Sequence, residues 1–165
     1  MKILAIDPGY DRLGIAVLNH EKSLGLLYSE CFIPEKGDFE ARLLKIVKKI
    51  RDIIGTHTPS ILGIETLFFT NNQKTALRVA ETRGAIISEA TQSGLAIHEF
   101  TPLEIKIAVT GYGRSDKKSV RAMVPRLVDC KKTIQFDDEY DAIATGITCA
   151  ASLRTRQLRA APPKV

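Results

Sequence analysis

Short apolar runs, each closed by a turn-forming residue, predict the strands of this chain. Residues 2–7 hold a continuous apolar run, Ile-Leu-Ala-Ile, which is typical of a strand covered on both faces. Pro8 and Gly9 end this strand and turn the chain back into a second strand at 13–18. A weakly alternating segment at 24–33 follows. The N-terminal part of the chain is therefore predicted to be an antiparallel meander.

Apolar residues repeated every three to four positions predict the helices. Gly55 is expected to end the first helix, and Ser115 is expected to cap the fourth. Two further strands, at 61–65 and 95–100, lie between helices. The expected helices span residues 38–54, 71–92, 102–108, 115–128 and 136–153.

The order of these elements predicts an α/β fold. We expect a five-stranded mixed sheet, in which the first three strands form antiparallel hairpins and the other strands run parallel, joined by right-handed crossovers and flanked by helices. The pattern contains no internal repeat and no linker. We therefore expect one domain over residues 1–153, followed by a basic, disordered tail at 154–165.

The composition narrows the class of protein. The chain has 165 residues, 44% hydrophobic and 26% charged, as in a globular protein, and no apolar run approaches the roughly 20 residues that span a bilayer. We expect a cytoplasmic protein with no membrane partner. The net charge of +5 favours an anionic partner such as nucleic acid. Cys31, Cys130 and Cys149 fit no metal-binding spacing, so no function is expected of them.

Carboxylates stand where two buried strands end. Asp7 closes the first strand and Glu65 the fourth, so the two side chains meet at one edge if these strands are neighbours. Asp138 and Asp141, three residues apart at the start of the last helix, share a face. Both groups of carboxylates also have a purely structural interpretation. An aspartate beside a Pro-Gly turn, such as Asp7, often only forms hydrogen bonds that stabilise the turn. Acidic residues such as Asp137 favour the first turn of a helix because of the helix dipole.

Carboxylates that converge on one point repel one another unless a cation lies among them. Because the set contains hard oxygen ligands and no His or Cys, it favours magnesium or manganese over zinc. Paired ions of this kind suit phosphodiester hydrolysis, in which one ion generates a hydroxide and the other stabilises the leaving 3′ oxygen. The product would carry a 5′ phosphate.

A series of short motifs then carries a family resemblance. In chain order they are Asp7-Pro8-Gly9, Ile64-Glu65, Phe68-Phe69, Arg83-Gly84, residues 108–117 (AVTGYGRSDK), Val120 with Met123-Val124, and Asp138 with Asp141-Ala142. Their order and spacing, from residue 1 to about 153, resemble those of the RuvC family of crossover junction endodeoxyribonucleases, the Holliday-junction resolvases of bacteria.

This resemblance implies an RNase H-like fold and a homodimer that acts in DNA recombination and repair. It implies paired, magnesium-dependent nicks in a four-way DNA junction, with Mn²⁺ as a substitute, two ions per site, and branch-migration proteins as possible partners. The implied metal ligands are Asp7, Glu65, Asp138 and Asp141, with Lys117 against the scissile phosphate. The implied DNA-binding residues are Phe68, Phe69, Lys106, Arg114, Lys117, Lys118 and Arg121.

Several alternatives remain open at this point. Residues 11–17 are closer to the YqgF family, relatives of the same fold linked to RNA processing, than to the usual resolvase turn. A junction-binding protein without catalysis is another alternative, although all four acidic positions are filled. An actin-like ATP-binding domain needs a second lobe, for which the chain has no room. The small residues of the 71–92 helix favour either a dimer interface or packing within the chain.

Overall fold

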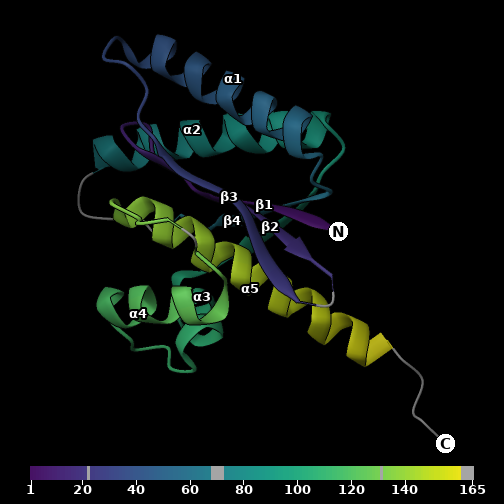
Figure 1. The fold of residues 1–165 in the computed structure, drawn as a ribbon. Coiled ribbons are helices and arrows are strands. Elements are labelled where there is room, and N and C mark those ends of the chain that lie inside the picture. Colours follow the sequence, from purple (N-terminus) through teal and green to yellow (C-terminus); the bar gives the residue numbers. More distant parts are fainter. Residues whose placement is uncertain (22, 68–72, 131, 161–165) are drawn as a thin grey trace, which may run out of the picture.

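The computed structural model describes residues 1–21, 23–67, 73–130 and 132–160. The backbone alternates between strands and helices after an initial meander of strands (Figure 1). The strands are β1 (Lys2–Asp7), β2 (Leu13–His20), β3 (Leu24–Phe32), β4 (Ile61–Glu65) and β5 (Ala96–Phe100). The helices are α1 (Phe39–His57), α2 (Gln73–Gln92), α3 (Pro102–Thr110), α4 (Lys117–Leu127) and α5 (Asp137–Ala160).

The sheet has the predicted mixed topology. Its five strands lie in the order β3-β2-β1-β4-β5. β2 pairs antiparallel with both β1 and β3, whereas β4 pairs parallel with both β1 and β5. The five-stranded sheet with an antiparallel and a parallel part is therefore confirmed, and β1 and β4 are neighbours as the strand-end argument required.

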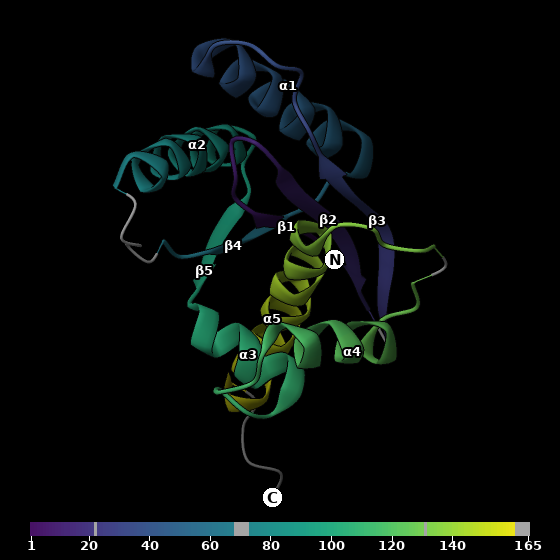
Figure 2. The same ribbon diagram turned by 90° about the vertical axis from the view of Figure 1, so that its left-hand side faces the viewer.

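The sheet separates two helical layers. Figures 1 and 2 show α1 and α2 on one side of the sheet and α5 on the other, with α3 and α4 beyond α5. Side chains of β1 alternate between the two layers: Leu4 and Ile6 pack with α1 and α2, whereas Ile3 and Ala5 pack with α5. Asp7 continues the second series and so lies on the α5 side of the sheet.

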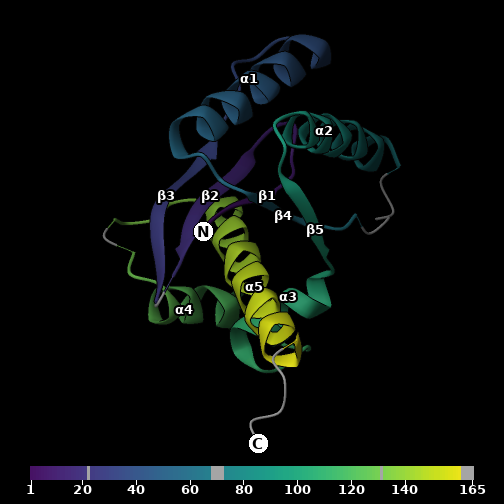
Figure 3. The same ribbon diagram turned by 90° about the vertical axis from the view of Figure 1, so that its right-hand side faces the viewer.

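α5 lies unusually close to the sheet, and two glycines permit this approach. A Cβ added to Gly146 on α5 would come within 2.2 Å of Leu18 Cδ1 and 3.1 Å of Ala5 Cβ. A Cβ added to Gly14 on β2 would come within 1.9 Å of the backbone oxygen of Asp138. Since residues 142–150 are all buried, α5 is the central helix of its layer (Figure 3).

Two predicted helix ends were wrong by a few residues. α1 continues through Gly55 to His57 and ends where Thr58 adopts a left-handed conformation, at φ 50°. A glycine in a helix costs only about 1 kcal/mol, which the burial of Ile50 and Ile53 offsets. The cap of α4 is Asp116, not Ser115, because the Asp116 side chain accepts the backbone N–H of Ser119.

α5 also extends to Ala160, so the tail expected at 154–165 was wrong for residues 154–160. The sequence after Leu153 contains good helix formers and no glycine or proline before Pro162, so nothing ends the helix earlier. Residues 161–165 lie outside the described part of the chain. Neither α5, at 24 residues, nor any other described helix is long and apolar enough to cross a membrane.

Candidate active site

The C-terminal ends of β1 and β4 bring two carboxylates to one edge of the sheet. Ile6 is paired with Ile64 in the parallel register, so Asp7 and Glu65 follow at adjacent strand ends. Arg83, from α2, donates from Nε to the carbonyl oxygen of Glu65 at 3.0 Å. This hydrogen bond fixes the end of β4, and with it the position from which the Glu65 side chain starts.

The start of α5 supplies the other two carboxylates, Asp138 in the first turn and Asp141 at the beginning of the second. The backbone of Asp138 lies directly over Gly14, whose added Cβ would also be 3.1 Å from Asp7 Cβ. Asp138, Asp141 and Glu65 all raise the pKa of Asp7 through their charges, as close neighbours do. The structure therefore brings together the four acidic residues that the sequence singled out.

The cluster carries an excess of negative charge. Asp7 is partly exposed, but the surrounding protein removes most of the water from its carboxylate. This desolvation, followed by the charges of the neighbouring carboxylates, raises the pKa of Asp7 from 3.8 to about 8. Desolvation, followed by the charge of Asp141, raises the pKa of Glu65 as well. A site of this kind favours a cation.

Two basic side chains partly neutralise the cluster. Lys117 Nζ lies 3.0 Å from Oδ2 of Asp141, and Arg12 Nε lies 3.4 Å from Oδ2 of Asp138. Lys117 also lines a cleft of about 180 Å³ together with Glu65, Lys106 and Asp141. The site is thus an acidic edge bordered by lysines, which is suited to a phosphate group that approaches metal-bound carboxylates.

The donor set fits a hard divalent cation such as Mg²⁺, because it consists of carboxylate oxygens alone. In the described part of the chain, no three His, Cys, Asp or Glu side chains surround a common point as metal ligands do. The reason is visible in the ion pairs, since Asp141 and Asp138 turn toward Lys117 and Arg12. In this structure the two aspartates are therefore paired with basic side chains and do not point at a common centre.

The predicted DNA-binding residues differ in how they relate to this edge. Lys106 and Lys117 line the cleft. Arg114 and Lys118 are exposed near the start of α4, whereas Arg121 forms an ion pair with Asp137. The other two predicted DNA contacts, Phe68 and Phe69, lie outside the described residues.

Two residues at the site were missed from the sequence. Gly14 interrupts a buried apolar strand, and a glycine at such a position is itself a signal of close backbone approach. Arg12 lies in the turn before β2, and a single arginine in a turn carries no sequence signal for a site contact. Cys31 pairs with Gly14 in the sheet, and its Sγ lies 4.0 Å from Asp138 Oδ2. Desolvation, followed by the charge of Asp138, raises the pKa of the Cys31 thiol to about 11. The thiol therefore stays protonated.

Comparisons with known proteins agree with this geometry. Residues 3–149 match the family model described as "Crossover junction endodeoxyribonuclease RuvC". The protein of that name from Petrotoga mobilis is 37% identical over 156 residues, which cover 93% of this chain and 95% of the relative.

Solved structures match as well. The Thermus thermophilus RuvC structure aligns with a TM-score of 0.85 at 25% identity, covering 94% of this chain and 97% of the other. The structure of T. thermophilus RuvC in complex with a Holliday junction substrate aligns with a TM-score of 0.88 at 24% identity, covering 94% and 96%, and it supports the fold. Nearly the whole of the chain is thus matched in both sequence and fold. The chain belongs to the RuvC family of crossover junction endodeoxyribonucleases.

Proposed function

We propose that this chain resolves four-way DNA junctions by paired, metal-dependent nicks that leave 5′-phosphate ends, and that residues 1–153 act as one nuclease domain. The proposal depends on one observation above all. Two carboxylates at adjacent parallel strand ends, Asp7 and Glu65, lie against two more at the start of α5. Together with membership of the RuvC family, this arrangement favours DNA cleavage over binding alone.

We infer that Asp7, Glu65, Asp138 and Asp141 hold Mg²⁺, with two ions per site and Mn²⁺ as a substitute. Such ions activate water as a nucleophile and stabilise the leaving 3′ oxygen. Asp7 must lose its proton for this role, since its pKa is about 8 when no cation is bound. The backbone contact at Gly14 keeps Asp138 close to Asp7, so the ligands do not have to be gathered from a distance.

Lys117 is proposed to leave Asp141 and contact the scissile phosphate. The Lys117 side chain is 69% exposed and lines the cleft, and its ammonium donates a hydrogen bond to Asp141 at 3.0 Å. We expect Lys117→Met to lower the cleavage rate at saturating junction by about 100-fold to 1,000-fold, as removal of one group that stabilises transition-state charge does. The single-turnover rate is the measurement. Lys48→Met, at an exposed position on α1, is the control. An unchanged rate in Lys117→Met would show that Lys117 has no role in the site.

Lys106, Arg114, Lys118 and Arg121 are proposed to contact the DNA backbone, and Phe68 and Phe69 to stack on unpaired bases. We expect Lys118→Ala to reduce the slope of log affinity against log salt by about 0.9, because one phosphate contact is lost. Junction binding titrated at several salt concentrations measures this slope. Lys36→Ala, in an exposed loop, is the matched control. An unaltered slope in Lys118→Ala would show that Lys118 does not contact the DNA backbone.

We propose a homodimer, because a two-fold symmetric pair of sites matches the two-fold related strands of a junction. α2 is the candidate interface: Leu77 is 59% exposed, and the space above Gly84 is open. We expect Leu77→Glu to weaken self-association by about tenfold or more, since a charge in an interface costs over 1 kcal/mol. Analytical ultracentrifugation checks this. Leu44→Glu on α1, at a leucine that is 70% exposed, should leave the mass unchanged. An unchanged mass for Leu77→Glu would exclude the α2 face as the interface.

The proposed function is tested with a labelled synthetic four-way junction beside a linear duplex and an RNA, each with and without Mg²⁺. We expect paired nicks confined to the junction and only with metal. Cleavage of RNA instead would favour the YqgF-like alternative, which the family match does not support. Tight junction binding without a cut under Mg²⁺ or Mn²⁺ would indicate an architectural protein. A cytoplasmic location, expected from the composition, and association with branch-migration proteins, implied by the family resemblance, stay predictions.

A further inference from the structure

The start of α5 carries four acidic residues, and each is paired with a cation outside that helix. Two of the cations come from α4, one from the turn before β2, and one from the segment before α5. The pairs are Asp137 with Arg121, Asp138 with Arg12, Glu139 with Lys132, and Asp141 with Lys117. The orientation of the first turn of α5 is therefore set by ion pairs with several other parts of the chain.

The pair formed by Glu139 differs from the others in its burial. The Glu139 side chain is only 6% exposed, whereas the three aspartates are between 21% and 49% exposed. Lys132 Nζ lies 2.7 Å from Glu139 Oε1. The Lys132 side chain is 50% exposed, so only the carboxylate end of this pair is shielded from water. Loss of the lysine would leave the buried carboxylate of Glu139 without a countercharge, which is strongly destabilising. Of these four acidic residues, Glu139 therefore depends most on its basic partner.

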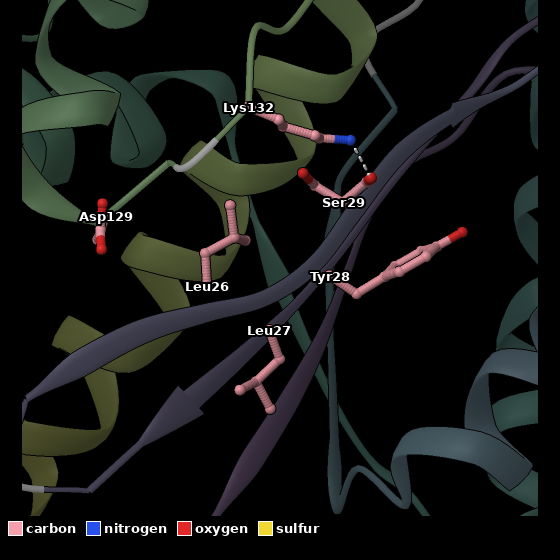
Figure 4. A pocket seen from close by; sticks show the side chains of 6 residues that line it. All are labelled: Leu26, Leu27, Tyr28, Ser29, Asp129 and Lys132. Atoms are coloured by element: carbon pink, nitrogen blue, oxygen red, sulfur yellow. Dashed lines mark hydrogen bonds between the residues drawn. The ribbon is translucent and has the colours of Figure 1, made fainter.

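Lys132 also binds the sheet. Its ammonium donates a hydrogen bond to the backbone oxygen of Ser29 on β3, as Figure 4 shows. β3 is one of the two edge strands, so carbonyl groups on its outer side depend on partners from outside the sheet. One ammonium therefore connects the edge of the sheet to the first turn of α5.

This connection bears on the catalytic carboxylates through helix geometry. Successive residues of a helix project about 100° apart, so fixing Glu139 against β3 also fixes the directions in which Asp138 and Asp141 project. Under the proposed function, on which this step rests, Lys117 must leave Asp141 for the phosphate. The first turn then needs an anchor that does not take part in the reaction.

We propose that Lys132 and Glu139 are positioning residues that hold Asp138 and Asp141 against Asp7 and Glu65. The family motif that the sequence showed does not include either of them. They act through the backbone of α5 and contact neither the phosphate nor the metal.

The test compares Lys132→Met with Lys132→Arg in the full chain. For Lys132→Met we expect a fall of about 10-fold to 100-fold in single-turnover rate at saturating junction, as loss of an outer partner of metal ligands produces. The Mn²⁺ concentration for half-saturation, read from the EPR signal of free Mn²⁺, should rise by a similar factor. Junction affinity should stay within about twofold, since Lys132 is not one of the proposed DNA contacts. Lys132→Arg, which keeps the charge, should recover most of both losses.

A second variant separates positioning from folding. Lys132→Met/Glu139→Gln leaves no unpaired buried charge, so it should fold, yet it should stay slow because the anchor to β3 is missing. Lys48→Met is again the control. A double variant with the wild-type rate and Mn²⁺ affinity would overturn the proposal, as would weaker junction binding at an unchanged rate in Lys132→Met. Should the wild-type chain cut no junction at all, the proposed function fails, while the Mn²⁺ measurement still decides whether Lys132 positions the carboxylates.

Discussion

Asp7→Asn is expected to abolish junction cleavage and, without divalent ions, to stabilise the fold. The carboxylate is lost as a ligand, and the several kcal/mol that metal contributes to the transition state correspond to a loss of about a thousandfold or more. The substitution also removes a negative charge that desolvation and the neighbouring carboxylates disfavour. A gain of about 1 kcal/mol would raise the melting temperature by about 2–4 °C for a chain of this size.

The pH dependence of this stabilisation follows from the raised pKa. Asp7 ionises near 3.8 in the unfolded chain but near 8 in the folded one, so the folded state binds the extra proton between these values. The free energy of unfolding of the wild type therefore falls as pH rises from about 4 to about 8. Asn is neutral throughout, so its advantage should grow across that window.

Differential scanning calorimetry in EDTA at several pH values, beside the cleavage assay, makes the comparison. Asp52→Asn, on exposed α1, controls for the loss of one negative charge. If Asp7→Asn melts below the wild type at pH 8, Asp7 supports the fold through a hydrogen bond and is not under electrostatic strain.

Gly14→Ala is expected to slow cleavage by about 100-fold, although β2, on which Gly14 lies, carries no catalytic group. The new methyl group would lie 1.9 Å from the backbone oxygen of Asp138 and 2.6 Å from its carbonyl carbon. Backbone cannot rotate away as a side chain can, so α5 must lift from β2 at its first turn. Overpacking of this kind costs about 1–3 kcal/mol, and displacement of reacting groups by about 1 Å costs about 100-fold in rate.

Gly25→Ala on β3 is the matched control, because nothing lies within 4 Å of its added methyl group. Cleavage rates at saturating junction and urea unfolding measure the two effects separately. A Gly14→Ala protein that is less stable but cleaves at the normal rate would show that the first turn of α5 tolerates movement away from Asp7.

The sheet and the acidic cluster were predictable because they depend on local signals. Continuous apolar runs fixed β1 and β4 as buried strands, and a charged residue that follows such a run must come out at its end. Parallel pairing then brought Asp7 beside Glu65. Helical periodicity placed Asp138 and Asp141 on one face, just ahead of the apolar run Ala142-Ile143-Ala144 that marks the buried part of the helix.

Other parts depend on tertiary contacts that the sequence does not display. α1 continues through Gly55 because its neighbours are buried, and packing overrides the weak preference of a single residue. Arg12 approaches Asp138 only because the turn after β1 leans over the start of α5. Glu139 resembled its neighbours in the sequence, yet it is the member of that acidic run whose side chain is buried.

The sheet divides the interior into two hydrophobic cores, and the two cores differ in how freely their residues can be substituted. Every proposed catalytic carboxylate lies on the α5 side, and the core beneath α1 and α2 includes none of them. Substitutions in that second core that leave Ile6, Ile64 and the Arg83 contact with Glu65 in place should alter stability without moving the ligands. Substitutions are therefore tolerated more readily on the α1 and α2 side of the sheet than on the α5 side. On the α5 side, Gly14 and Gly146 have no side chains and so set the distance between α5 and the strands.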